Sequence, residues 1–321
     1  MNQLAHLHQQ VELGLQELQL PNKPDNLYES IKYIIDLGGK RLRPVMVLLG
    51  NDVFGGQLNK ALPAALSIEL FHNFSLMHDD IMDNADLRRG KPSVHVQWNL
   101  PTAILGGDAL LVVAYQQLMK SSQEHVVELL NLFNVTALEV CEGQQMDMNF
   151  EVQNDVSVAD YLEMIRLKTA VLMGASFKMG AIIANASNFD ADLMYQFGQD
   201  LGVAFQLKDD FLDCFGNPSF GKVIGGDILE NKKTLMYLHA QHKGSQNQQE
   251  ELAELANVSD AKTKIHSTLK LFEATGAKAA AENKMNEYYK KALANLNNLH
   301  LSDVHKETLG KFAESIWQRQ K

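Results

Sequence analysis

The chain contains little cysteine, proline and aromatic residue, and it lacks a long apolar run. Its 321 residues include 2 cysteines, 7 prolines and 7% aromatic residues. Because so few cysteines come without a recognisable secretory leader, we expect no disulfide and a cytoplasmic location. No apolar run reaches the roughly 18 residues that a membrane-spanning helix needs. We expect Cys141 and Cys214 to be buried as small apolar side chains.

Positive charge is also scarce. The chain has 29 Lys and Arg against 39 Asp and Glu, a formal net charge of −10. Nucleic-acid-binding proteins are normally basic, so we expect no nucleic-acid partner. Two short basic clusters stand out against this background: Lys40, Arg41 and Arg43, and Arg88, Arg89 and Lys91. Such local reversals of charge suit phosphate binding.

The residues that are abundant favour helices. Hydrophobic residues make up 45% of the chain, and Ala, Leu, Met, Gln and Glu are common. We find no convincing strand pattern and no linker, which predicts one all-α domain over residues 1–321. The expected helices cover 1–20, 26–37, 44–50, a long helix opened by Pro63, 102–120, 124–142, 157–186, 190–215 and 227–240. We expect a loop at 84–101, a mobile loop at 216–226 and polar surface at 241–258.

The motif Asp-Asp-x-x-Asp occurs twice. The copies are Asp79, Asp80 and Asp83, and Asp209, Asp210 and Asp213. On a helix, positions i and i+4 share a face, so each copy directs carboxylates to one side. Carboxylates of this kind suit Mg²⁺, which commonly bridges one or two of them to substrate phosphates. Two facing motifs would hold a metal-bound polyphosphate between them.

A single such motif could be an ordinary solvated acidic face. Here each copy follows apolar residues that read as buried, and carboxylates there repel one another unless a cation is present. Glu69 and His72 form a Glu-x-x-His pair, which could indicate a di-iron site in a helix bundle. That chemistry requires a second such pair, and the sequence has none.

The segment GGKRLRP at 38–44 places Lys40, Arg41 and Arg43 at the start of a helix. Helix N-termini favour anions, and arginine adds a two-pronged donor for phosphate. The Walker A spacing is absent. The segment LRRGK follows the first aspartate motif, so Arg88 and Arg89 could contact the same phosphates.

Taken in order, these segments resemble the trans-isoprenyl diphosphate synthases, the farnesyl and geranylgeranyl diphosphate synthase family. The resemblance is carried by GGKRLRP, His72, DDIMD, LRRG, GQQMD at 143–147, Lys168-Thr169, FQLKDDFLD and GKVIGGDILENKKT at 221–234. It implies an all-α bundle of long helices around a deep central cavity, in a homodimer. The implied reaction joins isopentenyl diphosphate head-to-tail to an allylic diphosphate of C5, C10 or C15 and releases pyrophosphate.

The resemblance also implies roles for single residues. A cluster of three Mg²⁺ ions, which Mn²⁺ could replace, would be held by Asp79, Asp83 and Asp209, with Asp80 and Asp213 in support. Arg88, Lys168 and Lys232 would bind the allylic diphosphate, and the loop with Lys222 would close over it. Isopentenyl diphosphate would bind without metal to Lys40, Arg43, His72 and Arg89. Thr169 and Gln206 would line the cation-bearing part of the substrate, and Gln144 and Asp147 match a motif near the cavity.

The product length follows from the helix before the first motif. One helical turn rises about 5.4 Å, close to one isoprene unit. Ser75, four residues before Asp79, is small, and Phe74 beside it is large enough to act as a floor. We predict an all-trans C15 to C20 product, with C20 preferred.

Four alternatives stay open at this point. A non-catalytic partner subunit of a heteromeric synthase would normally lack an aspartate motif, whereas this chain keeps both. A synthase of longer products would keep every motif. A class I terpene cyclase shares the first motif, but its second metal motif reads (N/D)Dxx(S/T)xxxE rather than DDFLD. A helical scaffold with chance acidic faces would show no Mg²⁺-dependent ligand binding.

Overall fold

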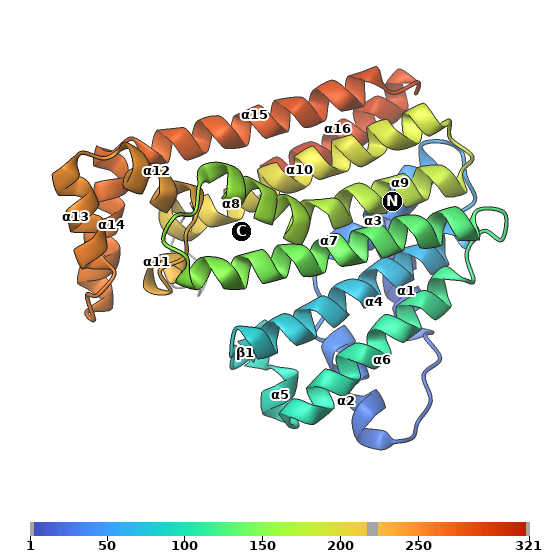
Figure 1. Ribbon diagram of the computed structural model, residues 1–321. Helices are drawn as coiled ribbons and strands as arrows, with labels where there is room; N and C mark the ends of the chain where they lie inside the picture. The colour runs from blue at the N-terminus through green and yellow to red at the C-terminus, as the bar shows by residue number, and fades with distance from the viewer. Residues whose placement is uncertain (1–2, 217–223, 319–321) are drawn as a thin grey trace. The chain divides into compact units, whose positions relative to one another are not determined.

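The computed structural model describes residues 3–216 and 224–318. The chain is helical almost throughout (Figure 1), which confirms the predicted all-α class. It divides into two compact units. Unit 1 comprises residues 1–134 and 175–194, and unit 2 comprises residues 135–174 and 195–321.

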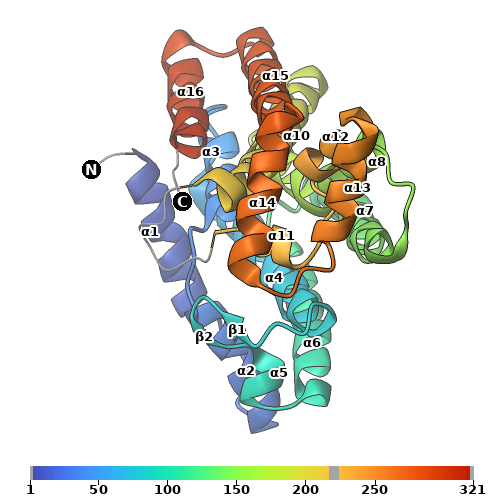
Figure 2. The ribbon, with the colours of Figure 1, turned by 90° about the vertical axis from the view of Figure 1, so that its left-hand side faces the viewer.

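Unit 1 is organised around a long helix, α4 (Leu58–Met82), which packs along α6 (Leu100–Leu118). The helix α3 (Leu42–Asp52) packs on α4, and α5 (Val94–Gln97) lies beside α2 (Asp25–Asp36) (Figure 2). A two-residue hairpin, β1 (Leu87–Arg88) and β2 (Lys91–Pro92), pairs Leu87 with Pro92 and Arg88 with Lys91. The first helix is α1 (Gln3–Gln16). Unit 1 therefore carries both basic clusters and the first aspartate motif.

Three helices contribute residues to both units: α7 (Val126–Val152), α9 (Val171–Ile183) and α10 (Asn188–Phe215). The rest of the chain's helices belong to unit 2. They are α8 (Val158–Ile165), the π-helix η1 (Arg166–Ala170), α11 (Gly226–Leu229), α12 (Leu235–Lys243), α13 (Gln246–Leu255), α14 (Ala261–Ala274), α15 (Ala277–Asn298) and α16 (Asp303–Trp317). In Figure 1, α12, α13 and α14 gather at one end of α15. Their core includes Tyr161, Leu207, Leu238 and Phe272.

The structure corrects several expected boundaries. Pro63 does not open α4, which begins five residues earlier at Leu58. The expected loop at 84–101 contains the hairpin and α5, and the helix expected at 124–142 extends to Val152. The polar segment at 241–258 is not merely surface, because it forms α13 with Leu252 and Leu255 buried.

The single helix expected at 227–240 is two helices. The break between α11 and α12 is a regular helix stop in which Asn231 has φ +56°. The N–H of Asn231 donates to the Ile228 carbonyl, and that of Lys232 donates to the Asp227 carbonyl. A left-handed residue after the last helical turn, closed by such bonds, is a common C-terminal cap.

Cys214 is buried, as expected, whereas Cys141 is exposed. Cys141 lies on an exposed face of α7, so its predicted burial is wrong. Burial and the nearby Asp213 raise the pKa of the Cys214 thiol, which keeps it protonated. None of the helices in the described residues is long and apolar enough to cross a membrane.

Candidate active site

The glycine pair before α3 brings two basic segments together. Gly38 and Gly39 have φ of +75° and +143°, which side-chain-bearing residues rarely adopt. A Cβ added to Gly39 would lie 2.6 Å from Nη2 of Arg89, whereas one added to Gly38 would meet nothing within 4 Å. Gly39 therefore leaves the space that the Arg89 guanidinium fills.

Arg41 takes a structural position within this cluster. Its side chain is buried and donates to Oε1 of Glu69 at 2.6 Å, to Oε1 of Glu12 at 3.0 Å and to the Ile35 carbonyl at 2.8 Å. Glu69 is thus engaged by a guanidinium, an arrangement that differs from the metal ligation of a di-iron site. Arg41 anchors the start of α3, and its neighbours Lys40 and Arg43 remain the candidates for phosphate binding.

His72 on α4 lies among positive charges. Its Nε2 is 3.2 Å from Nη1 of Arg43. Burial lowers the pKa of His72 well below 6.5, and the charges of Arg43, Arg89, Arg88 and Arg41 lower it further. Burial and neighbouring arginines also lower the pKa of Arg89. Cations crowded in this way repel one another, and an anion such as diphosphate would relieve that repulsion.

The first aspartate motif occupies the last turn of α4. Asp80 is fully buried, and Oδ1 of Asp80 accepts from Nε of Arg88 at 2.9 Å. Asp83 is the C-cap residue, and its N–H donates to the Asp79 carbonyl at 2.8 Å. Asp79 and Asp83 are therefore one helical turn apart and more accessible than Asp80. The family resemblance implies that Arg88 binds the allylic diphosphate. In the structure, the guanidinium of Arg88 pairs with Asp80.

The second aspartate motif lies near the end of α10, and its Asp210 takes part in a chain of hydrogen bonds. Asp210 accepts from the Tyr161 hydroxyl at 2.6 Å and from Nε2 of Gln206 at 2.8 Å. Thr169 in turn donates to Oε1 of Gln206 at 3.1 Å. Burial and the charge of Asp227 raise the pKa of the Asp210 carboxyl to about 7. The sequence did not indicate Tyr161, whose partner lies 49 residues away.

The π-helix η1 brings Lys168 to α7. A Cβ on Gly143 would lie 2.3 Å from the Lys168 backbone nitrogen, so only glycine permits this approach. Nζ of Lys168 pairs with Oδ2 of Asp147 at 2.6 Å. The amide of Gln144 is buried with no hydrogen-bond partner among the described residues. π-helical turns frequently occur at functional sites, and a buried amide without a partner requires an explanation, of which a functional role is one.

The segment after α10 continues this arrangement. Oδ2 of Asp213 accepts the N–H of Asp227 at 3.0 Å. Nζ of Lys232 lies 3.7 Å from Oδ1 of Asp227 and 2.9 Å from Oε2 of Glu230. Burial lowers the pKa of Lys232, but these two carboxylates outweigh it and raise the pKa above its usual value. Lys222, the expected loop lysine, lies outside the described residues.

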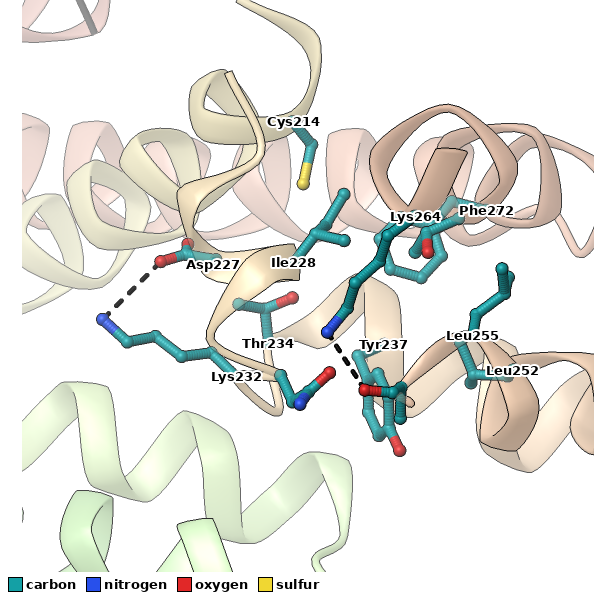
Figure 3. A pocket seen from close by; sticks show the side chains of 13 residues that line it. Cys214, Asp227, Ile228, Lys232, Thr234, Tyr237, Leu252, Leu255, Lys264 and Phe272 are labelled. Carbon is teal, nitrogen blue, oxygen red and sulfur yellow. Dashed lines mark hydrogen bonds and ion pairs between the residues drawn. The ribbon is translucent and has the colours of Figure 1, made fainter. Parts of the chain in front are cut away.

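The pocket beside this segment is too small for a substrate (Figure 3). It encloses about 20 Å³, which is about enough for one water molecule. Asp227 and Lys232 lie on one of its sides, and Tyr237, Leu252 and Phe272 close the other. It is a packing gap around α11 rather than a binding site.

Phe74 belongs to an aromatic cluster next to the first motif. Its ring centroid lies 5.5 Å from that of Phe71 and 4.9 Å from that of His78. Phe71 also contacts Phe133 edge-on at 5.2 Å. Ser75 donates to the His72 carbonyl and keeps only a small side chain at its position. Phe74 therefore packs between Phe71 and His78 of its own helix.

The carboxylates suit a Mg²⁺ ion whose coordination is completed by substrate phosphates and waters better than a metal ion that only protein side chains hold. No group of three or more His, Cys, Asp or Glu side chains within the described ranges lies close enough to hold a metal ion. Mg²⁺ is usually held by one or two carboxylates, with substrate phosphates and waters completing its octahedron. Asp79 and Asp83, one turn apart, offer that number of ligands.

Comparison with known proteins identifies the family. A sequence profile described as polyprenyl synthetase matches residues 24–273. The geranylgeranyl diphosphate synthase of Methanosarcina mazei is 40% identical over 247 residues, which cover 76% of each chain. The geranylfarnesyl diphosphate synthase of Natronomonas pharaonis is 40% identical over 246 residues, covering 70% of this chain and 72% of the relative. A crystal structure of a geranylgeranyl pyrophosphate synthase covers 100% of both chains with a TM-score of 0.94 and 42% identity. The chain belongs to the polyprenyl synthetase family.

Proposed function

We propose that this protein condenses isopentenyl diphosphate with an allylic diphosphate to give an all-trans prenyl diphosphate of C15 to C20, with C20 preferred. The observation that carries the proposal is the pairing, in unit 1, of two different phosphate-binding chemistries. Arg43 and Arg89 form a cationic cluster around the neutral His72, and Asp79 with Asp83 forms a carboxylate pair. A terpene cyclase binds a single diphosphate and has no need of the cationic cluster.

Isopentenyl diphosphate would bind to the cationic cluster without metal. Arg43 and Arg89 supply charged donors, and Lys40 adds a third charge at the same helix start. A neutral His72 can donate from one ring nitrogen while the other stays unprotonated. The repulsion among the arginines would then favour the diphosphate-bound state over the empty one.

The allylic diphosphate would bind through Mg²⁺ to Asp79, Asp83 and Asp209, supported by Asp80 and Asp213. The metal would neutralise the pyrophosphate as it departs and so lower the barrier to leaving. Lys168 and Lys232 would add direct contacts to the same group, each already held by a carboxylate neighbour. The pair formed by Arg88 and Asp80 would fix both side chains beside the motif.

The reaction then needs little covalent chemistry from the protein. The allylic C–O bond breaks, the alkene of isopentenyl diphosphate forms the new C–C bond, and a proton leaves to the departed pyrophosphate. Thr169 and Gln206 would present oxygens toward the positive charge on the allylic carbon. Gln206 is oriented by the hydrogen bond that its Nε2 donates to Asp210, a carboxylate that also accepts from the Tyr161 hydroxyl.

We further propose that the enzyme is a homodimer paired through α6. Leu105, Val112 and Met119 recur every seven residues, so they share one face of the helix. They are 60%, 56% and 57% exposed. An apolar stripe with this period pairs well with a second copy of itself, as in coiled coils. Val112→Glu should therefore shift the protein from dimer to monomer in sedimentation, while Val304→Glu, at an exposed valine of α16, should not.

Magnesium-dependent binding of pyrophosphate tests the proposed site most simply. Isothermal titration should show tight binding of pyrophosphate in Mg²⁺ and little in EDTA. Asp83→Asn should weaken that binding about tenfold or more, since a charged ligand is lost. Asp36→Asn, at an exposed aspartate at the end of α2, is the matched control and should bind as the wild type. Equal binding with and without Mg²⁺ would count against the proposal.

A further inference from the structure

Lys264 on α14 is the only buried lysine among the residues that the structure describes, with 6% of its surface exposed. Its Nζ donates to the Ala256 carbonyl at 3.1 Å and to the Leu229 carbonyl at 3.3 Å. Figure 3 shows the Lys264 side chain among the residues that line the small pocket. Burial of an ammonium group is unfavourable unless hydrogen bonds compensate for the lost solvation, and the two carbonyls provide such bonds for Lys264.

Both acceptors lie at helix C-termini. Leu229 is the last residue of α11, and Ala256 is the C-cap residue of α13. The last carbonyls of a helix have no partner within it, and a cation there is favourable. Lys264 therefore ties the end of α11 to the end of α13.

The opposite end of α11 is held by the second aspartate motif. The carbonyl of Asp213 accepts the Gly225 N–H at 2.7 Å, and Oδ2 accepts the Asp227 N–H at 3.0 Å. Gly225 has φ +83°, and a Cβ there would lie 2.8 Å from Ile265, the residue after Lys264. α11 is thus fixed at its start by Asp213 and at its end by Lys264.

The four residues of α11 and the turn after them carry Asp227 and Lys232. The N–H of Lys232 donates to the Asp227 carbonyl at 2.9 Å, so the turn moves with the helix. We propose that Lys264 is a positioning residue for allylic diphosphate binding, which acts by holding α11 so that Asp227 and Lys232 stay in place. This inference rests on the proposed role of Lys232 and concerns a side chain that does not touch the substrate.

The test compares Lys264→Met with Lys264→Arg and with Lys262→Met. Methionine keeps the length and removes the donor, arginine keeps a donor and charge, and Lys262 is an exposed lysine on the same helix. Misplacing a binding group by about 1 Å can cost about 100-fold in rate. For Lys264→Met we expect the KM of the allylic substrate to rise about tenfold, and the KM of isopentenyl diphosphate to change less than twofold. Lys264→Arg should recover much of the loss, and Lys262→Met should match the wild type.

Equal changes in both KM values, or no change in either, would overturn the proposal, because general destabilisation does not choose between substrates. If Lys264→Met does not fold, Lys264→Gln keeps an uncharged NH2 donor of shorter reach and should give an intermediate rise. Mg²⁺-dependent binding of inorganic pyrophosphate provides a second measurement that needs no turnover. Wild-type protein that binds pyrophosphate but forms no prenyl product would contradict the proposed reaction. The Lys264 variants would then be compared by pyrophosphate binding alone, and binding by Lys264→Met equal to that of the wild type would overturn the proposal.

Discussion

Gly39→Ala offers a direct test of the cationic cluster in unit 1. The added Cβ would lie 2.6 Å from Nη2 and 2.7 Å from Nη1 of Arg89, distances that real contacts do not show. The obstacle is the end of a flexible side chain rather than backbone. The guanidinium should therefore swing away while α3 and α4 keep their packing. Arg89 would leave the place where we propose that it meets isopentenyl diphosphate.

Gly39→Ala should change two separate quantities, the stability of the fold and the affinity for isopentenyl diphosphate. A residue with a Cβ at positive φ costs about 1–3 kcal/mol of stability. The loss of one charge-assisted hydrogen bond to a phosphate costs about 1.5–3 kcal/mol of binding. At about 1.4 kcal/mol for each factor of ten, the KM of isopentenyl diphosphate should rise about 10- to 150-fold. The KM of the allylic substrate should stay within about twofold.

Gly38→Ala is the matched control. Gly38 also has positive φ, but a Cβ there meets nothing within 4 Å. Both variants should lose stability in thermal or denaturant unfolding, and only Gly39→Ala should lose affinity for isopentenyl diphosphate in steady-state kinetics. If Gly38→Ala raised that KM as much, the effect would come from backbone strain. An unchanged KM in Gly39→Ala would remove Arg89 from the site.

Three further variants probe other parts of the account. Phe74→Ala should lengthen the products seen by reversed-phase chromatography, and an unchanged distribution would show that Phe74 is not the floor. Tyr161→Phe should lower kcat/KM for the allylic substrate about tenfold, since Asp210 would lose a 2.6 Å hydrogen bond; unaltered kinetics would mean that this bond does not orient the site. Burial raises the pKa of Asp200 to about 6, so its charge destabilises the fold increasingly as pH rises from about 4 to 6. That shift corresponds to at most about 3 kcal/mol, or about 1 kcal/mol after solvent screening. Asp200→Asn should therefore raise the melting temperature at pH 8 and not at pH 4, and a gain of equal size at both would refute the assignment.

The sequence predicted the helical class and most long helices because periodic apolar residues decide both. It was wrong at Pro63, where the missing N–H leaves the carbonyl of Asn59 without its helical donor. Asn59 is exposed, so water can take that role and the helix can begin earlier. The predicted burial of Cys141 was also wrong, because a small residue in a long helix can face either the core or the solvent.

A better use of local signals could have found α13. Ser245 and Gln248 form a capping box, and Leu252 and Leu255 follow at helical spacing. The Gln-rich composition hid this pattern. By contrast, the contacts of Tyr161 and Lys264 could not be predicted, because their partners depend on tertiary packing across separate helices. The aspartate and basic motifs were identifiable because they combine several charged residues at fixed spacing.

Product analysis tests the central claim most directly. Purified protein would be given Mg²⁺ and isopentenyl diphosphate with C5, C10 or C15 allylic diphosphate in separate reactions, each repeated in EDTA. The account predicts linear all-trans diphosphates that stop at C15 to C20, need both substrates and disappear in EDTA. Geranylfarnesyl or longer products would keep the reaction and remove the proposed floor. Cyclic hydrocarbon from an allylic substrate alone, or no product in any reaction, would contradict the account.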